Sequence, residues 1–147
     1  MQSRSCVFCD IVAGLSPSSV VHSDEHCLAF MDILPVTPGH LLVVPRVHAT
    51  YLADLPSAVG KALFETTLLL ADAVRRSGLR VEGINLFLAD GEAAGQEVFH
   101  VHVHVLPRFK GDGFGLRLPP GYGSEATREQ LDAHAATIRS ALGANSS

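Results

Sequence analysis

Three histidines at every second position are the residues in this sequence best suited to chemistry. His100, His102 and His104 alternate with valines in the stretch 98–106. If this stretch is a β-strand, the three imidazoles share one face, because side chains two residues apart in a strand point the same way. The residues alone allow a histidine-rich solvent face, a three-histidine metal site, or nucleophilic catalysis, since a neutral imidazole can attack phosphorus.

A second candidate is the pair Cys6 and Cys9, which are separated by two residues near the start of the chain. This spacing fits a metal-binding thiolate pair, a redox-active pair or two buried thiols. His48 is a candidate third ligand. The chain has three cysteines, and this odd number favours a reducing compartment over a disulfide framework.

The segments that must position these residues predict an α+β domain with an antiparallel sheet of about five strands. Periodic apolar residues predict a central helix over Ser57–Ser77 and a C-terminal helix over Thr127–Leu142, with Gly143 as its stop. We expect strands at 27–31, 40–44, 84–88 and 98–106, and a short helix or turn at 8–13. We expect a single domain over residues 1–143 and a flexible C-terminal tail at 144–147.

The overall composition limits the classes of function. The 147 residues are 47% hydrophobic and 18% charged, as in globular proteins. The net charge of -4 and the pI near 6.0 do not suggest the basic face of a nucleic-acid-binding protein. No segment approaches the roughly 20 apolar residues of a membrane span, and Met1 is not followed by a signal peptide. We therefore expect a cytoplasmic protein with neither nucleic-acid nor membrane partners.

The residues around the histidines resemble the signature of the histidine-triad (HIT) superfamily. Residues 95–108, GQEVFHVHVHVLPR, are similar to that signature. FMDI at 30–33 with PGHLLVVP at 38–45 is similar to the other block of the family, and GDGFG at 111–115 resembles a segment of bacterial members. The resemblance extends from Cys6 to the last helix, and it favours nucleophilic catalysis. It also implies a HIT-like fold and a two-fold dimer built through the central helix and a strand.

The resemblance implies a catalytic role for four histidines. The middle histidine of the triad, here His102, is the nucleophile in the family: it attacks the α-phosphorus of a nucleotide, and water then releases a nucleoside monophosphate. His104 and His40 match positions that contact the phosphate or support the nucleophile. His100 belongs to the hydrogen-bonding relay behind it.

The resemblance also implies a nucleotide-binding set. Asp32 falls where the family binds the ribose hydroxyls, for which carboxylate oxygens are suitable acceptors; on its own it equally fits a turn. Gly95 lets the backbone approach a phosphate, and the amide of Gln96 can donate a hydrogen bond. Ile33 and Leu42 fit either a base-flanking role or core burial. The expected set is Asp32, Ile33, Leu42, Gly95, Gln96, Glu97, Val98, His102 and His104.

Two positions depart from the family pattern. Glu97 stands where phosphoramidase members have a serine that handles the leaving amine. A glutamate there could donate a proton if its pKa is raised, whereas an ionised glutamate would repel a phosphate. Ala89 stands where some members have a polar amide. These differences affect the leaving-group preference and leave the core chemistry intact.

Bacterial members of the family are similar to this chain in a further respect, a zinc site. By that resemblance Cys6, Cys9, His48 and His100 form a closed Cys2His2 set, which is typical of structural zinc. Zinc on His100 would fix the orientation of that ring and brace the segment that carries His102.

The sequence therefore predicts a hydrolase for nucleotides substituted at the α-phosphate. The candidate substrates are purine nucleoside phosphoramidates and dinucleoside polyphosphates, and the expected ligand is an AMP-type purine nucleotide. The alternative is a nucleotide-binding regulator or interaction protein with little turnover. The expected cofactor is structural zinc, and the expected assembly is a homodimer.

Overall fold

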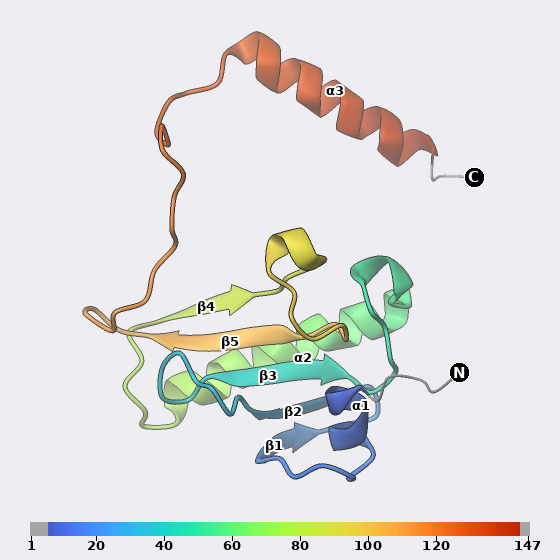
Figure 1. Cartoon of the computed structure of the whole chain (residues 1–147), viewed down its shortest axis with the longest axis vertical. Helices are drawn as coiled ribbons and strands as arrows, with labels where there is room; N and C mark the ends of the chain where they lie inside the picture. Colours follow the sequence, from blue (N-terminus) through green and yellow to red (C-terminus); the bar gives the residue numbers. More distant parts are fainter. Residues whose placement is uncertain (1–5, 145–147) are drawn as a thin grey trace. The chain divides into compact units, whose positions relative to one another are not determined.

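The computed structural model describes residues 6–144, which form two compact units. The first unit ends at Phe114 and contains a β-sheet with two helices (Figure 1). The second begins at Gly115 and contains an extended segment and one helix, α3 (Arg128–Ala144). None of the helices in the described chain is both long and apolar enough to cross a membrane.

The sheet of the first unit has five antiparallel strands in the spatial order β1-β2-β3-β5-β4 (Figure 1). This arrangement confirms the predicted α+β class. The strands are β1 (Val20–Ser23), β2 (Cys27–Met31), β3 (Leu41–Pro45), β4 (Gly83–Phe87) and β5 (Val103–Arg108).

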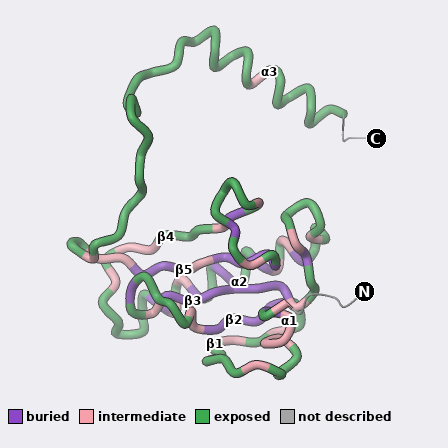
Figure 2. The backbone as a smooth tube through the Cα atoms, in the orientation of Figure 1, coloured by how far each residue is buried: buried purple, intermediate pink, exposed green. Residues whose placement is uncertain are grey.

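Both faces of the sheet are covered, which explains why its central strands are apolar throughout. Residues of β3 alternate between two cores: Leu41 and Val43 pack in one, and Leu42 and Val44 in the other. Figure 2 shows the resulting concentration of buried residues in β2, β3 and β5.

Each core is closed by a different helix. The helix α2 (Ser57–Arg76) buries Leu63, Leu70 and Val74 against one face, and each such side chain stabilises the fold by about 1.5–3 kcal/mol. The short helix α1 (Val7–Val12) places Phe8 on the other face. Two 3-10 helices, η1 (Leu52–Asp54) and η2 (Glu92–Ala94), lie in the connecting loops.

The strand prediction for 98–106 is wrong over its first half, since β5 begins only at Val103. The pairing of β5 with β3 ends at Val43 and Val103. Pro45 has no N–H to donate, its carbonyl accepts a hydrogen bond from the His100 ring, and the N–H of Val101 donates to Ala49 instead. The ladder therefore stops, although side chains still alternate and Val101 stays in the α2 core.

The C-terminal helix also differs from its prediction at one end. The capping box is confirmed, because Thr127 and Gln130 exchange side-chain to backbone hydrogen bonds of 3.0 and 3.2 Å. Gly143 is not the stop, since α3 continues to Ala144 and Gly143 has no left-handed backbone. Ala144 thus belongs to a helix, whereas the rest of the predicted tail, 145–147, lies outside the described residues.

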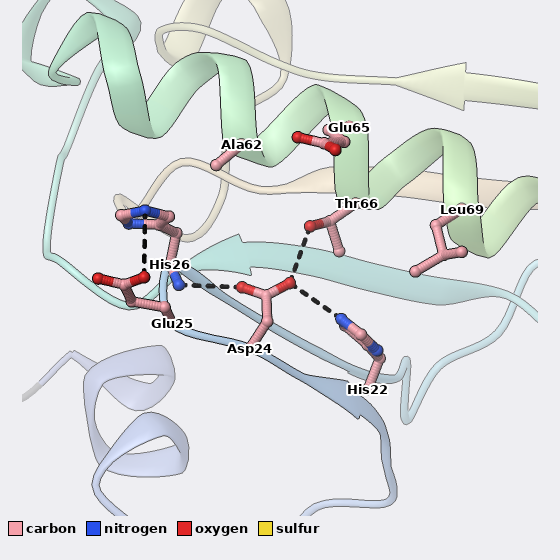
Figure 3. Close-up of a pocket in the computed structure, with 8 residues that line it drawn as sticks. All are labelled: His22, Asp24, Glu25, His26, Ala62, Glu65, Thr66 and Leu69. Carbon is pink, nitrogen blue, oxygen red and sulfur yellow. Dashed lines mark hydrogen bonds and ion pairs between the residues drawn. The ribbon is translucent and has the colours of Figure 1, made fainter.

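Asp24, in the turn between β1 and β2, ties this hairpin to α2 (Figure 3). Its Oδ1 accepts the backbone N–H groups of His26 and Cys27 at 2.9 and 2.8 Å. Its Oδ2 accepts the Thr66 hydroxyl at 3.0 Å and lies 2.9 Å from Nε2 of His22. Burial alone would raise the pKa of Asp24, but these hydrogen bonds lower it to about 2. The residues surround a depression of about 400 Å³.

We expect Asp24→Ala to lower the free energy of unfolding by about 1–3 kcal/mol at neutral pH, because it leaves the donors on Cys27 and Thr66 without their acceptor. The folded-state pKa lies below the ordinary 3.8, so this contribution is present above that value and is lost as the pH falls towards about 2. Urea unfolding measures it. Glu25→Ala, at a side chain that is 89% exposed, is the control and should change stability by less than about 0.5 kcal/mol. Equal effects of the two substitutions would contradict the anchoring role.

Candidate functional site

A cleft of about 760 Å³ lies on the α1 side of the sheet. Phe30, Leu42 and Leu106 of the central strands line it, together with residues of α1 and of the loops after β2 and before β5. Three of the predicted catalytic histidines, His40, His102 and His104, also line the cleft. The structure therefore brings together residues from opposite ends of the first unit's sequence.

His102 is held in a single tautomer by its own backbone. Its Nδ1 lies 2.7 Å from the carbonyl oxygen of His100. A carbonyl can only accept, so Nδ1 carries the proton and Nε2 keeps its lone pair. Burial lowers the pKa of His102, against the opposing effects of this hydrogen bond and of Asp32. The ring of Phe8 packs edge-on at 5.1 Å between centroids. At neutral pH the cleft thus contains an uncharged imidazole with a free lone pair, which is the form that a nucleophile requires.

His40 and His104 form a hydrogen-bonded relay beside it. The backbone N–H of Val36 donates to Nδ1 of His40 at 3.1 Å, so the proton of His40 is on Nε2. This Nε2 lies 2.9 Å from Nδ1 of His104, which accepts the hydrogen bond and leaves the proton of His104 on its own Nε2. Burial and the neighbouring imidazoles of His102 and His40 lower the pKa of His104 to about 4. The relay therefore ends in a neutral N–H donor.

Gly39 permits the close approach that places His40. Its φ is +92°, in the left-handed region, and a Cβ there would lie 2.8 Å from Cδ1 of Leu79. Any other residue would strain the backbone at this positive φ and would displace the end of the Leu79 side chain.

Asp32 lies in a turn, one of the two roles that its sequence position allowed, and it also lines the cleft. Its Oδ1 accepts the backbone N–H of Leu34 at 2.8 Å, as in a turn. Its Oδ2 lies 3.4 Å from Nε2 of His40, and the residue lines the cleft. Asp32, His40 and His104 are near enough to one another to surround a metal ion. However, the Nε2 of His40 carries a proton, so this group is a hydrogen-bonded relay and not a set of free ligands.

The other predicted nucleotide-binding residues separate into two groups. Ile33, Leu42, Gly95, Glu97 and Val98 line the cleft. Gln96 does not: it is buried, and the predicted donation from its amide to a phosphate is not supported. Its Oε1 accepts the N–H of Gly91, and its Nε2 donates to the carbonyls of Thr50 and Val98. Gln96 instead holds the loop that presents Glu97 and Val98.

Several contributors to the site were absent from the sequence prediction, and two of them act on the histidines directly. Phe8 contacts the rings of both His100 and His102 and packs on Phe30. Its position between Cys6 and Cys9 in the sequence could have indicated that it lies near the site. The carbonyl of Pro45 accepts a hydrogen bond from Nε2 of His100 at 2.8 Å. This role could not be predicted from the sequence, because every residue has a carbonyl.

The predicted metal-binding residues come together next to this cleft. Cys6, Cys9, His48 and His100 have all four ligand atoms within 4.8 Å of one another. The Sγ of Cys9 lies 3.3 Å from Nδ1 of His48 and 3.6 Å from Nδ1 of His100, and the Sγ of Cys6 lies 3.5 Å from the latter. A tetrahedral zinc ion with ordinary bond lengths needs about 3.6 Å between sulfur and nitrogen. The three sulfur-to-nitrogen distances are therefore close to those of a zinc site.

The protonation of these groups also suits a cation. Because Nε2 of His100 donates to the Pro45 carbonyl, the lone pair of this ring is on Nδ1, beside the sulfurs. Burial, followed by a hydrogen bond with Cys6 and the charges of Cys6 and Asp10, raises the pKa of Cys9 to about 11. A cation between the sulfurs would reverse this shift and stabilise the thiolates.

Comparisons with known proteins agree with this architecture. The sequence matches the HIT domain family over residues 13–111. It is 44% identical to Protein hit of Bacillus subtilis, over 77% of this chain and 78% of that protein. It is 36% identical to adenylylsulfatase HINT3 of Arabidopsis thaliana, over 74% of this chain and 55% of that protein.

Solved structures are similar over nearly the whole chain. A HIT family protein from Bacillus anthracis superposes with a TM-score of 0.86 at 38% identity, covering 95% of this chain and 99% of that one. A zinc-bound histidine triad family protein from Mycobacterium smegmatis superposes with a TM-score of 0.73 at 40% identity, covering 93% and 97%.

The buried histidines predict a loss of stability in mild acid. Burial lowers the folded-state pKa values of His40, His102 and His104 below 6.5, so unfolding takes up protons as the pH falls below that value. The contribution of these neutral histidines to the free energy of unfolding is complete above about pH 6.5. It should be lost progressively towards about pH 4, and His104 alone should account for on the order of 1–3 kcal/mol of the loss. Urea unfolding across this range measures the loss. His104→Asn should flatten the pH dependence, and an unchanged slope in this variant would contradict the assignment.

Proposed function

Because the chain belongs to the HIT family, we propose that it hydrolyses nucleotides substituted at the α-phosphate, with His102 as the nucleophile. The observation that carries this proposal is the hydrogen bond from Nδ1 of His102 to the His100 carbonyl, which leaves the lone pair of Nε2 available in the cleft. The name of the plant relative, an adenylylsulfatase, supports hydrolysis of an adenylyl compound. Candidate substrates are purine nucleoside phosphoramidates and dinucleoside polyphosphates.

The proposed reaction has two displacements at phosphorus. In the first, Nε2 of His102 forms a bond to the α-phosphorus, and the bond from phosphorus to the leaving atom breaks with its electron pair. The leaving group takes a proton and departs. In the second, a water oxygen attacks phosphorus, the N–P bond breaks and the lone pair returns to Nε2. The water loses a proton to solvent, which balances the one taken by the leaving group, and a nucleoside monophosphate is released.

The neighbouring residues would bind the substrate and orient the groups that react. The Nε2–H of His104 can donate to a non-bridging phosphate oxygen where charge increases in the transition state. His40 keeps His104 in this tautomer, so it acts as a positioning residue. The carboxylate of Asp32 can accept from the ribose hydroxyls. Ile33 and Leu42 provide apolar surface for a purine base.

His102→Ala tests the proposal. We expect kcat/KM for adenosine phosphoramidate or a diadenosine polyphosphate to fall by more than about 10³-fold, because the attacking atom is removed. His26→Ala, outside the cleft and on the surface of the hairpin, is the matched control and should retain turnover. If the wild type turns over neither compound but binds AMP, a nucleotide-binding regulator becomes the better account.

We further propose that zinc is the resident metal of Cys6, Cys9, His48 and His100. The sulfur-to-nitrogen distances and the zinc-bound relative support this assignment. Bound there, zinc would supply a closed structural site with no open position for water. The residues themselves then link α1 to the backbone of His100, whose carbonyl orients His102.

Substitution of a thiol tests the zinc site. We expect the purified protein to contain about one zinc per chain and Cys9→Ser to lose it, with a fall of at least about 5 °C in the thermal midpoint. Elemental analysis and thermal unfolding are the measurements. Cys27→Ser is the matched control for metal content, because Cys27 is buried in the α2 core away from the four ligands. Full zinc content in Cys9→Ser would rule out the assignment.

We also propose that the chain forms a homodimer through α2 and a strand. Phe64, Leu68 and Leu69 of α2 are exposed, as is Leu86 on the edge strand β4. Exposed apolar side chains on α2, and the unpaired edge of β4, each support a contact between copies.

A further inference from the structure

The charges around the cleft point to a leaving group that carries a positive charge, and we propose Glu97 as the residue that selects it. This inference rests on the proposed hydrolysis at His102. It narrows the substrates to nucleotides joined to a cationic amine and disfavours those joined to an anionic group.

The strand register places Asp32 and Glu97 at opposite ends of the cleft. The N–H of Asp32 donates to the carbonyl of His40, beside the first residue of β3. The loop that carries Glu97 is fastened beyond the last residue of β3, because the amide of Gln96 donates to the carbonyl of Thr50. A nucleoside held at Asp32 therefore directs the other substituent of its phosphate towards Glu97.

His102 lies between these two ends. Its neighbour Val103 pairs with Val43 in the middle of β3. A phosphorus atom attacked by His102 thus has its nucleoside on one side and its leaving group on the other, and Glu97 is the charged residue on the leaving-group side.

The cleft contains carboxylates but no cationic side chain. Among the residues of 6–144 that line it, none is lysine or arginine, and Asp32 and Glu97 are the acidic ones. Glu97 is exposed, and within the described chain it has no hydrogen bond or ion pair. The carboxylate is therefore available to a ligand.

The arginines at the ends of the flanking strands are engaged elsewhere. Arg108 donates to the carboxylate of Asp112 at 2.7 and 2.9 Å and to Asn85 at 2.6 Å. Arg46 donates to the backbone carbonyl of Asp24 at 2.7 Å and to the hydroxyl of Ser23. Neither guanidinium is available to neutralise a second phosphate or a sulfate beside Glu97.

These charges have opposite consequences for two kinds of leaving group. A polyphosphate or sulfate would bring further negative charge next to Glu97, and no lysine or arginine is among the described residues that line the cleft. An amine with a pendant ammonium would meet an unpaired carboxylate. Because Glu97 is exposed to solvent, its effect is modest. We expect kcat/KM to change by about 2- to 5-fold at low salt for each change of one charge on the leaving group.

Three matched substrates test this proposal: AMP joined through its phosphate to butylamine, to putrescine and to γ-aminobutyrate. Their leaving groups are of similar length and are neutral, cationic and anionic. We expect kcat/KM to be highest for putrescine and lowest for γ-aminobutyrate, and the differences to shrink as salt is added.

Substitutions at Glu97 should change this order. Glu97→Gln should make the three rates nearly equal, and Glu97→Lys should reverse their order. Glu92→Gln removes an exposed acidic residue of η2 that does not line the cleft, so it should keep the wild-type order. Equal rates in the wild type, or an unchanged order in Glu97→Gln, would overturn the proposal.

Binding separates this inference from the proposed reaction. Calorimetry of the three conjugates with His102→Ala measures charge preference without hydrolysis. Tighter binding of the putrescine conjugate, lost on adding Glu97→Gln, supports the role of Glu97 even if the wild type hydrolyses none of them. Equal affinities would refute the role of Glu97, whatever the outcome for turnover.

Discussion

The hydrogen bond between the ring of His100 and the carbonyl of Pro45 connects the two chemical sites of this protein. It occupies the carbonyl with which the β3 ladder could have continued, so the backbone of 98–102 runs free of the sheet. It also sets the tautomer of His100, whose Nδ1 lies beside the two cysteines. The carbonyl of the same residue then orients His102. One residue thereby joins the candidate metal site to the candidate nucleophile.

The two faces of the sheet carry different groups of residues, and the cleft lies on only one of them. On its α2 face, alternate residues of β2, β3 and β5 form a continuous apolar core. On its α1 face the same strands present Phe30 and His104, and His40 and His102 lie directly before β3 and β5. Because successive residues of an extended chain point to opposite faces, His102 and His104 each have buried valines on either side that hold the backbone in place. Substitutions on the α2 face therefore affect folding, whereas those on the α1 face affect both the second core and the site.

Neutral groups dominate the interior of the cleft. Burial lowers the pKa values of its three histidines, and backbone or imidazole partners set the tautomer of each. Such a site offers lone pairs and N–H donors without formal positive charge. Its charged groups are carboxylates, which lie near the ends of the cleft. The proposed preference for a cationic leaving group rests on this arrangement.

The sequence alone determined the elements whose signals are local. The period of α2, the capping box of α3 and the alternation of His100, His102 and His104 with valines all depend on residues within a few positions of one another. The site residues were identifiable because their types and spacing are unusual. β1 was missed, since it is a four-residue, mostly exposed strand with an irregular register.

Only the tertiary structure decided the features that depend on partners remote in sequence. Cys6 and His100, 94 positions apart, meet because α1 packs on the sheet face that carries the histidines. The early end of the β5 ladder depends on Pro45, the structural role of Gln96 on Thr50, and the tautomer of His40 on the backbone of Val36. A hydrogen bond is specified by the position of both its donor and its acceptor, whereas a sequence pattern specifies one chemical group at a time.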